Sequence, residues 1–413
     1  MLTIAILGVG SRGEWAYLKN FSKNSDIQIT ALCDIRQDIL DNVAKKYPLK
    51  NVKTFADEND FFNAGKLADA IVIATLDQDH YRHTKQAILL GYDILLEKPV
   101  TAIKEEMDEL AELANKHNAK ILVCHVLRYA PYYQKIKEII DSGAIGNIVN
   151  ISHTENIGYW HFAHSFTRGN WRNSNTTAPS LLAKSCHDMD LFNWFVDSKP
   201  LKVSSFGSLK HFHKGNIPTN ATTHCLKGCP YYHTCPFSVK KIYLDNRAIM
   251  HGSLPHVIRL AYRPKKEEAI SILSNNDYGR CVYQCDNNVC DHQIVNIEYS
   301  NGVVVSFTMT AFTKNCYRRI HITGTKGELF GADINNSLQL NIFGQKPKKI
   351  KVHIPKWAGH LGGDKGICKT FYQYITNKPI NKNLLTTLDV SVDSHNIAYG
   401  AEKSRKENIV VEL

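Results

Sequence analysis

The order of apolar and polar positions predicts alternating strands and helices over about the first 125 residues. Between the apolar runs lie segments with helical periodicity, and Glu105–His117 is the most clearly amphipathic of them. Alternating strands and helices are typical of a parallel sheet with helices on both faces. We therefore predict an α/β, doubly wound domain over residues 1–125. Its apolar runs of strand length are Ile4–Leu7, Ile27–Leu32, Ala68–Thr75, Asp93–Leu96 and Lys120–Cys124.

The pattern changes after residue 125, where strands begin to follow one another. Asn301-Gly302 lies between two of them and is a strong hairpin signal. We predict an α+β domain over residues 126–413 with a large, mostly antiparallel, open sheet, an insertion at about 211–280 and terminal helices at 366–376 and 388–406. The predicted strands are Ile148–Glu155, Leu201–Ser208, Gln293–Tyr299, Val303–Phe312, Arg318–Thr323, Glu328–Asp333, Leu338–Phe343 and Ile350–His353.

A glycine-rich turn joins the first strand to the first helix. Gly8, Gly10 and Gly13 have the spacing G-x-G-x-x-G, which suits a tight turn, close approach of a pyrophosphate and helix–strand packing. Asp34 follows Gly13 by 21 residues (34 − 13), where a carboxylate binds ribose hydroxyls. The alternative is a tight turn with an unrelated acid. We predict an NAD site, with NADP the less favoured cofactor, formed by Gly8, Gly10, Ser11, Arg12, Gly13, Asp34 and Arg36.

Composition narrows the class of protein. The chain is 43% hydrophobic and 22% charged, which is ordinary for a globular protein, and it has no apolar run of transmembrane length. It enters a strand at Met1–Ile4 without a basic region and cleavage site, so we expect a cytoplasmic protein that does not bind membranes. The net charge is +11, but no basic stripe with interleaved aromatics appears, so no nucleic-acid partner is expected.

Three stretches together resemble the Gfo/Idh/MocA (glucose–fructose oxidoreductase, inositol dehydrogenase, rhizopine catabolism) family. They are Gly8–Gly13 with Asp34, Ala74–His83 leading to Glu97-Lys98-Pro99, and Leu181–Asp190; the similarity continues to Gly359–Asp364. The resemblance implies NAD(P) binding by the first domain, a sugar or polyol against the open face of the second sheet, and a homodimer or homotetramer packed sheet to sheet. It adds Thr75, His80, Glu97 and Lys98 to the predicted cofactor contacts.

The predicted catalytic residues are Lys98, His187 and Lys184. Lys98 follows the end of a parallel strand, which faces the ligand crevice in open α/β sheets, and the resemblance implies a cis bond to Pro99. His187 matches the family's catalytic histidine, whose pKa suits proton transfer from a hydroxyl. Many relatives carry aspartate four residues earlier, where this chain has Ala183 followed by Lys184. The alternatives are a lysine that only pairs with surface acids and a histidine that packs at the helix start.

The loop 159–172 is rich in aromatic, basic and amide side chains, which bind sugar faces, hydroxyls and carboxylates. It leads toward the helix of His187, so we expect substrate contacts here; a loop packed under the sheet is the alternative. His292 opens a later strand and is a further candidate. The predicted substrate contacts are Arg128, His164, Arg168, Trp171, Arg172, Asp188 and His292.

The 11 cysteines are scattered and odd in number, which favours free thiols in a reducing compartment. Cys225, Cys229 and Cys235 form C-x3-C-x5-C, without the C-x2-C pair usual in zinc sites. We expect no metal, and a structural zinc tying the insertion together is the alternative.

These observations predict an NAD-dependent oxidoreductase that transfers a hydride between a carbohydrate or polyol carbinol and the nicotinamide. Two alternatives stay open. One is a glycosidase that oxidises its sugar transiently and eliminates the aglycone, with a glycoside as substrate. The other is a non-catalytic, NAD-linked regulator with the same fold.

Overall fold

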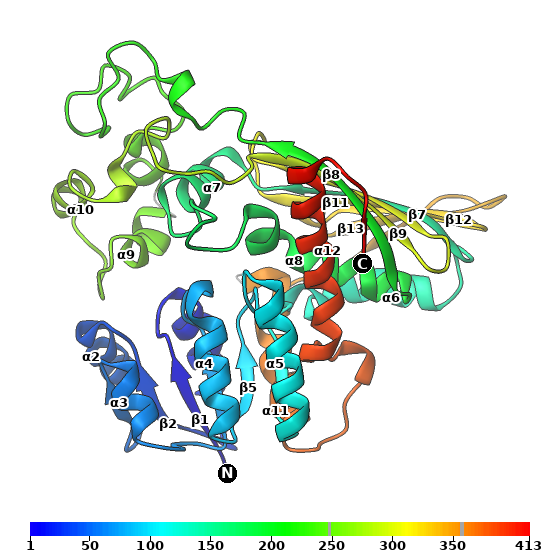
Figure 1. Ribbon diagram of the computed structural model, residues 1–413, viewed down its shortest axis with the longest axis horizontal. Helices are drawn as coiled ribbons and strands as arrows, with labels where there is room; N and C mark the ends of the chain where they lie inside the picture. Colours follow the sequence, from blue (N-terminus) through cyan, green and yellow to red (C-terminus); the bar gives the residue numbers. More distant parts are fainter. Residues whose placement is uncertain (247–248, 356–358) are drawn as a thin grey trace.

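The computed structural model describes residues 1–246, 249–355 and 359–413. Figure 1 shows a parallel sheet flanked by helices at the N-terminal end of the chain and a broad, curved sheet formed by later residues. Among the described residues, no helix is long and apolar enough to cross a membrane.

The first sheet has six strands, all parallel, in the order β3-β2-β1-β4-β5-β6. This confirms the predicted doubly wound domain. The strand order reverses between β1 and β4, and ligands bind at such a switch point in open α/β sheets. The short strand β3 lies where the sequence indicates only a turn, because three residues carry no readable alternation. The strands are β1 (Leu2–Leu7), β2 (Ile27–Cys33), β3 (Lys53–Phe55), β4 (Ala70–Ile73), β5 (Asp93–Leu96) and β6 (Ile121–Val123).

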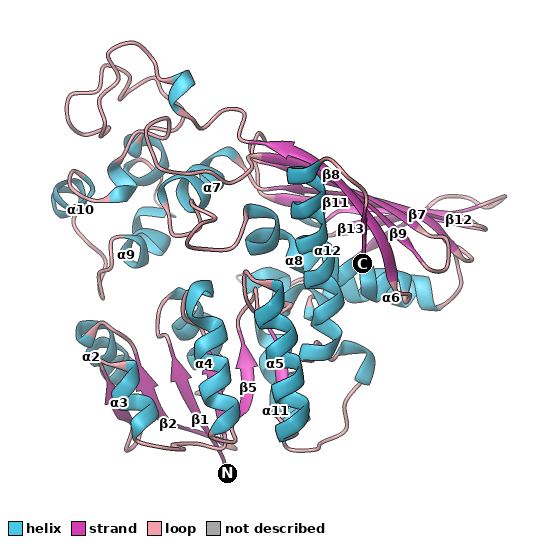
Figure 2. Ribbon diagram, in the orientation of Figure 1, coloured by secondary structure: helices cyan, strands magenta, loops and turns pink. Residues whose placement is uncertain are grey.

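Helices cover both faces of this sheet (Figure 2). Phe21, at the end of the first helical segment, packs on one face together with Phe371 from the C-terminal part of the chain. The opposite face packs against α3, α4 and α5, through residues such as Phe61, Ile88 and Leu110. The helical segments are η1 (Arg12–Leu18), α1 (Lys19–Phe21), α2 (Gln37–Lys46), α3 (Glu58–Asn63), α4 (Asp77–Leu89) and α5 (Lys104–His117).

The second sheet has nine strands in the order β14-β13-β12-β11-β7-β10-β9-β8-β15. Every neighbouring pair is antiparallel except β7 and β10, which confirms the predicted, mostly antiparallel sheet. The strands are β7 (Ile148–Asn156), β8 (Pro200–Ser208), β9 (His292–Tyr299), β10 (Val304–Thr310), β11 (Tyr317–Gly324), β12 (Gly327–Ala332), β13 (Ser337–Ile342), β14 (Lys348–Lys351) and β15 (Val411–Glu412).

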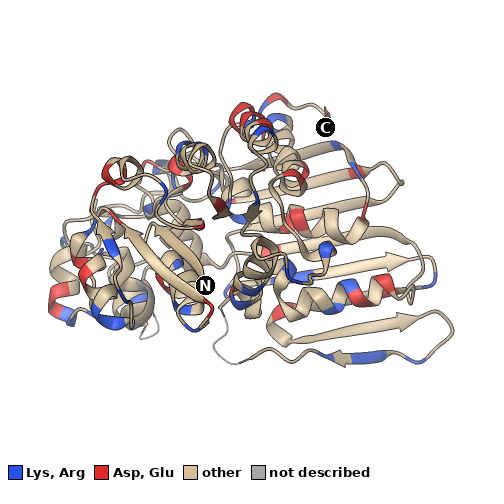
Figure 3. Cartoon of the chain, turned by 90° about the horizontal axis from the view of Figure 1, so that it is seen from below, with Lys and Arg blue, Asp and Glu red and all other residues tan. Residues whose placement is uncertain are grey.

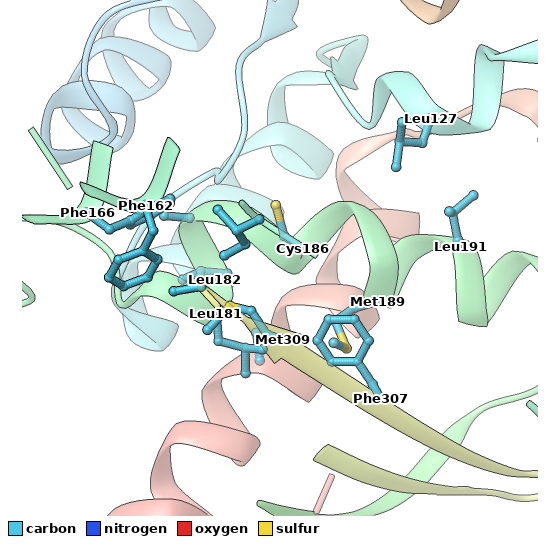
Figure 4. Close-up of a cluster of buried hydrophobic side chains, with 14 of the residues drawn as sticks. Leu127, Phe162, Phe166, Leu181, Leu182, Cys186, Met189, Leu191, Phe307 and Met309 are labelled. Carbon is cyan, nitrogen blue, oxygen red and sulfur yellow. The ribbon is translucent and has the colours of Figure 1, made fainter. Parts of the chain in front are cut away.

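One face of this sheet is covered by α6 (Pro131–Asp141), α8 (Ser180–Val196) and α12 (Leu388–Glu407). Along β9, the buried Val295 and Ile297 alternate with the exposed Ile294 and Asn296. Because alternate side chains point to opposite faces of a sheet, the other face is open. Almost every residue of α8 is buried. Figure 4 shows its apolar side chains beside Phe307 and Met309 of β10 and Phe162 and Phe166 of the preceding loop. This packing holds α8 in a defined orientation.

Two later parts of the chain return to the first domain. Helix α11 (Gly363–Ile375) places Ile367 and Phe371 in the core of the parallel sheet. The insertion also reaches this domain, because the rings of Trp15 and His256 meet edge to face at 4.4 Å. The domain limits 1–125 and 126–413 stay a prediction. Helix α11 belongs to the second of these ranges, yet it packs in the core of the first.

The remaining described segments are short. Three lie near the crevice described below: η2 (Val126–Tyr129), α7 (Tyr159–Phe162) and η3 (Ala163–Arg168). The insertion is largely irregular, as expected, and holds η4 (Lys214–Asn216), η5 (Lys240–Leu244), η6 (Ile249–Ser253), α9 (Leu254–Val257), α10 (Lys266–Leu273) and η7 (Asp277–Gly279). The others are η8 (Asp333–Asn335), η9 (Gly359–Gly362) and η10 (Lys382–Leu384).

Candidate functional site

The glycine turn has no room for side chains at its two ends. A Cβ at Gly13 would lie 1.9 Å from the carbonyl oxygen of Gly8, and Gly8 itself has a φ of +87° beside Ala74. Gly10 is different, because a Cβ there would meet nothing within 4 Å. The exposed Ser11 precedes η1, whose unpaired backbone N–H groups favour an anion. The turn therefore fits a pyrophosphate at Gly10.

Asp34 lies at the end of β2, beside this turn. Its carboxylate accepts hydrogen bonds from the backbone N–H of Val9 (2.8 Å) and of Arg36 (3.0 Å). Burial raises the pKa of Asp34, and these two hydrogen bonds oppose that shift. The guanidinium of Arg36 binds Asp38 and the backbone oxygen of Arg259, so this part of the insertion lies next to the predicted ribose site.

Arg12 connects the glycine turn to two distant acids. Its guanidinium lies 2.6 Å from Glu97 and 3.0 Å from Asp364, and it also contacts the hydroxyl of Tyr17 at 3.0 Å. Burial alone would raise the pKa of Glu97, but the charges of Arg12 and Lys98 hold it below its ordinary value. The Arg12 guanidinium is thus bound to carboxylates of the protein. Its predicted contact with the cofactor would therefore be made by its backbone N–H.

Thr75 and His80 follow the end of β4. The backbone oxygen of Thr75 lies 3.2 Å from Nε2 of His80, and Nδ1 of His80 lies 2.7 Å from the backbone oxygen of Pro99. The Lys98–Pro99 bond is cis, as the resemblance implied. The ends of β4 and β5 are therefore linked through one buried imidazole.

Lys98 and His187 come from different domains and lie close together near the carboxyl ends of the parallel strands, where open α/β sheets bind ligands in a crevice. The ammonium of Lys98 donates a 2.7 Å hydrogen bond to the backbone oxygen of Ala183, one helical turn before His187 in α8. Burial lowers the pKa of His187 well below its ordinary value, and the positive charge of Lys98 acts in the same direction. His187 is therefore a neutral imidazole at neutral pH, as a proton acceptor must be.

Lys184 belongs to a buried charged network behind this pair. It lies 3.4 Å from Glu155, which also binds the guanidinium of Arg318 at 2.8 Å. Arg318 in turn binds the carboxylate of Asp188 at 2.7 and 3.1 Å, and His153 lies 2.9 Å from the same carboxylate. Asp188 is fully buried and committed to these partners. We therefore correct its predicted role from substrate contact to support of α8.

The loop 159–172 packs against the insertion. Arg168 is 1% exposed and donates to the backbone oxygens of Arg280 (2.7 Å) and Phe237 (2.8 Å). Arg172 pairs with Asp286 at 2.9 Å and with Asp277 at 3.2 Å. These contacts leave Arg168 no access to a substrate, so its predicted role is corrected to a structural one. Arg172 is partly exposed, and its contact with substrate stays a prediction.

Two other residues of this loop are partly buried. His164 meets the rings of Tyr243 and Tyr278, with centroids 5.8 and 5.4 Å away, and Trp171 packs near Phe166. These contacts correspond to the alternative of a loop packed inside the domain. Substrate contact by His164 and Trp171 stays a prediction.

Arg128 is also held elsewhere, and His292 lies on the second sheet. The buried guanidinium of Arg128 forms a bidentate pair with Asp190, at 2.9 and 2.7 Å. His292 has the same strand parity as the exposed Ile294, which places it on the open face of the sheet, whereas α8 covers the other face. We therefore correct the prediction for Arg128, whose side chain is committed to Asp190. Substrate contact by His292 stays a prediction.

The cysteines of the insertion lie near one another. Cys225, Cys229, Cys235 and Cys281 line one small cavity of about 20 Å³ beside Arg168. Among residues 1–246, 249–355 and 359–413, however, no three His, Cys, Asp or Glu side chains are grouped so as to hold a metal ion, and the described cysteines are free thiols. That they are ordinary thiols without metal stays a prediction.

Charge is spread over the surface. Figure 3 shows Lys and Arg interspersed with Asp and Glu on the helices, and a basic run on β14, whose Lys348, Lys349 and Lys351 lie at the edge of the second sheet. This distribution adds no site to the crevice between Lys98 and His187.

The sequence reasoning missed several residues at this site. Arg318 and Glu155 face α8 from neighbouring strands. Both strands carry several polar residues, so nothing in the sequence singled these two out. His125 lies at the end of β6 and is buried beside His187. Its position after a predicted strand was a usable signal, because the carboxyl ends of parallel strands border the crevice.

Two family models match the chain. One, described as "Oxidoreductase family, NAD-binding Rossmann fold", matches residues 2–125, and the other, "Oxidoreductase family, C-terminal alpha/beta domain", matches residues 137–411. Together they cover both sheets and the crevice between them.

Individual relatives are more distant. A Bacillus subtilis protein named as an oxidoreductase, YteT, is 24% identical over 80% of this chain and 76% of its own length. The D-glucoside 3-dehydrogenase of Escherichia coli is 26% identical over 36% of this chain and 41% of its own length. The structure of scyllo-inositol dehydrogenase from Lactobacillus casei, with bound NAD(H) and scyllo-inositol, covers 100% of this chain and 99% of its own with a TM-score of 0.66 and 17% identity.

Proposed function

Since the chain belongs to the Gfo/Idh/MocA oxidoreductase family, we propose that it is an NAD-dependent dehydrogenase acting on a carbinol of a sugar or polyol. The observation that carries the proposal is the hydrogen bond from Lys98 to the turn of α8 that precedes His187. It brings a lysine from the cofactor domain and a histidine from the second domain to the same crevice. The glycoside and inositol dehydrogenases among the relatives support a carbohydrate or polyol as the substrate class.

The residues of the crevice have separate tasks. The open space at Gly10 and the carboxylate of Asp34 fit the pyrophosphate and ribose of NAD, which accepts a hydride from the substrate carbon when bound. His187, neutral because it is buried, takes the hydroxyl proton as that hydride leaves. Lys98 donates a hydrogen bond to the same oxygen and steadies its developing charge. Lys184, tied to Glu155, supports the turn of α8 that carries His187.

We expect Asp34 to favour NAD over NADP. Its carboxylate would bind ribose hydroxyls and repel a ribose phosphate, and Arg36 beside it is already bound to Asp38. Replacing Asp34 with serine removes the repulsion, so the ratio of kcat/KM for NADP to that for NAD should rise about tenfold or more. Asp41→Ser, an exposed change on α2, is the matched control and should leave the ratio unchanged. An unmodified protein that binds NADP more tightly than NAD contradicts this expectation.

We further propose that the protein is a homodimer or homotetramer joined through the open face of the second sheet. Several apolar side chains are exposed on the strands there, which supports a buried interface, since monomers rarely expose large apolar patches. They are Phe206, Ile294, Val304 and Phe330.

A substrate screen on the purified protein tests the proposed activity. Sugars, polyols and aryl glycosides are each incubated with NAD or NADP while absorbance at the nicotinamide band and release of the aglycone are followed. The proposal expects reduced cofactor in proportion to the oxidised sugar or polyol. Aglycone release without net cofactor reduction would instead identify a glycosidase that recycles its hydride, and cofactor binding without either product would identify a regulator.

A further inference from the structure

His125 is a buried histidine with no assigned task. It lies two residues after the end of β6 and is 0% exposed. Among the residues that the structure describes, neither of its ring nitrogens has a hydrogen-bond partner. Buried polar atoms are nearly always paired, so two unpaired nitrogens on one ring require an explanation. A purely structural histidine would have the pattern of His395, whose Nε2 accepts from the backbone N–H of Val100 and whose Nδ1 donates to the backbone oxygen of Ser391.

The unpaired ring lies next to the predicted catalytic base. The centroids of His125 and His187 are 5.9 Å apart, with the ring planes at 82°. Nδ1 of His187 is also enclosed without a partner among the described residues. The two rings are thus neighbours with unpaired nitrogens and no direct hydrogen bond between them, and one bridging water would satisfy a nitrogen on each.

The other imidazoles nearby are already engaged. His360 lies 6.3 Å from His187 between ring centroids, but its Nδ1 is 3.0 Å from a carboxylate oxygen of Asp364. His395 lies 5.8 Å from His125, and both of its nitrogens are used by the backbone. Of these three rings, His125 alone retains two nitrogens without described partners.

We propose that His125 is the positioning residue for His187: through a bridging water it accepts a hydrogen bond from Nδ1–H of His187, and so leaves Nε2 of His187 as the base toward the substrate. This inference rests on the proposed dehydrogenase function. In the oxidation the substrate O–H bond breaks and an Nε2–H bond forms on His187. The resulting imidazolium keeps its Nδ1–H directed at His125, which spreads the charge over two rings while the hydride pair leaves the carbon.

The surroundings of His125 keep it a neutral acceptor. Burial lowers its pKa to about 4; Arg128 and Lys98 act in the same direction, and Asp190 and Glu97 oppose them. Around His187, the charges besides Lys98 are Arg318 and, when protonated, His125 and His360. At neutral pH His125 therefore has a lone pair that can accept a hydrogen bond. The positive groups around His187 disfavour its imidazolium, and a water-bridged hydrogen bond to His125 opposes that effect.

Two variants at this position separate the proposal from simple packing. His125→Phe fills the cavity without a nitrogen, and kcat should fall about ten- to a hundredfold, with the acidic limb of the pH profile moved to lower pH because the imidazolium of His187 loses its acceptor. His125→Gln keeps an acceptor and should recover a large part of that loss. His395→Gln, which keeps an acceptor for Val100, is the matched buried control and should stay within a few-fold of the unmodified protein.

A second readout does not depend on turnover. In protein labelled with ¹⁵N-histidine, the His187 signal, identified by its absence in His187→Ala, should show the Nδ1–H tautomer, and His125→Phe should shift it toward Nε2–H. An unchanged tautomer together with an unchanged kcat and pH profile in a folded His125→Phe would overturn the inference. If no sugar or polyol is oxidised at all, the tautomer still tests the histidine pair, so failure of the proposed function and failure of this inference are distinguishable.

Discussion

Replacing His187 with alanine is expected to lower kcat about a hundred- to ten-thousand-fold, which is the usual loss when a positioned acid–base group is removed. The imidazole, carried by α8, is buried and its pKa is depressed, so it is neutral and can take the hydroxyl proton at neutral pH. Lys98→Met should fall on the same scale, because it removes the hydrogen bond that steadies the same oxygen. Both variants should still bind NAD, since Gly8–Gly13 and Asp34 are untouched.

Combining Lys98→Met with His187→Ala gives a sharper test. Lys98 and His187 act on one proton, and Lys98 also bonds to the turn before His187. The combined loss should therefore be much smaller than the product of the single losses. Steady-state kinetics and cofactor titration of the single and double variants measure this, with the exposed His117→Ala and Lys116→Met as controls of the same residue types. Near-normal turnover in a folded His187→Ala would place the chemistry on another residue.

Replacing Asp188 with alanine is expected to lower the free energy of unfolding by about 3–5 kcal/mol, the loss typical of removing one partner from a buried ion pair. Its carboxylate is fully buried and binds Arg318 at 2.7 Å and His153 at 2.9 Å. Without it the guanidinium of Arg318 keeps only Glu155 as a charged partner. Because α8 carries both this contact and His187, we expect a loss of activity to accompany the loss of stability. Urea unfolding measures the change.

A double variant and the pH dependence distinguish this effect from simple damage to the core. Asp188→Leu with Arg318→Met removes both charges, so it should be more stable than Asp188→Leu alone. The exposed Asp108→Ala, which breaks only a surface pair with Lys104, should change stability by about 1 kcal/mol or less. Equal losses at Asp188 and Asp108 would refute the network.

The sign of the acid dependence follows from the same contacts. Burial opposes ionisation of Asp188, but Arg318 and His153 outweigh it and hold the pKa well below its ordinary value. The folded pKa is thus lower than the unfolded value of about 3.9. The stabilisation is therefore present above that value and is lost as pH falls below it toward the folded pKa. Asp188→Asn should flatten this part of the stability curve.

The amino-acid sequence alone determined the parallel domain and the position of its cofactor turn. Gly8, Gly10 and Gly13 follow a strand and begin a helix, and the conformations required there are local, so spacing is enough to predict them. The antiparallel second domain was also predictable, since successive strands with a hairpin signal such as Asn301-Gly302 leave few other arrangements. Lys98 and His187 were predicted from the resemblance to the family, because both lie in short motifs that it shares.

Which polar side chains reach the crevice was decided only by the tertiary structure. Arg168 and Arg172 lie in a segment whose composition suits sugar binding, yet the insertion, more than 50 residues further along the chain, supplies the groups that bind them. His292 lies on the open face of the second sheet because a strand sends alternate side chains to opposite faces, and its register is set by β8 and β10.

The support behind His187 also depends on distant partners. Asp188 finds Arg318 130 residues later, and His125 approaches His187 because β6 and α8 border the same crevice. Ion pairs and ring contacts of this kind leave no periodic trace in the sequence, since each is made by two residues whose separation along the chain is arbitrary. The physical reason is that burial and charge pairing act through space, whereas the hydrophobic period reports only the local backbone.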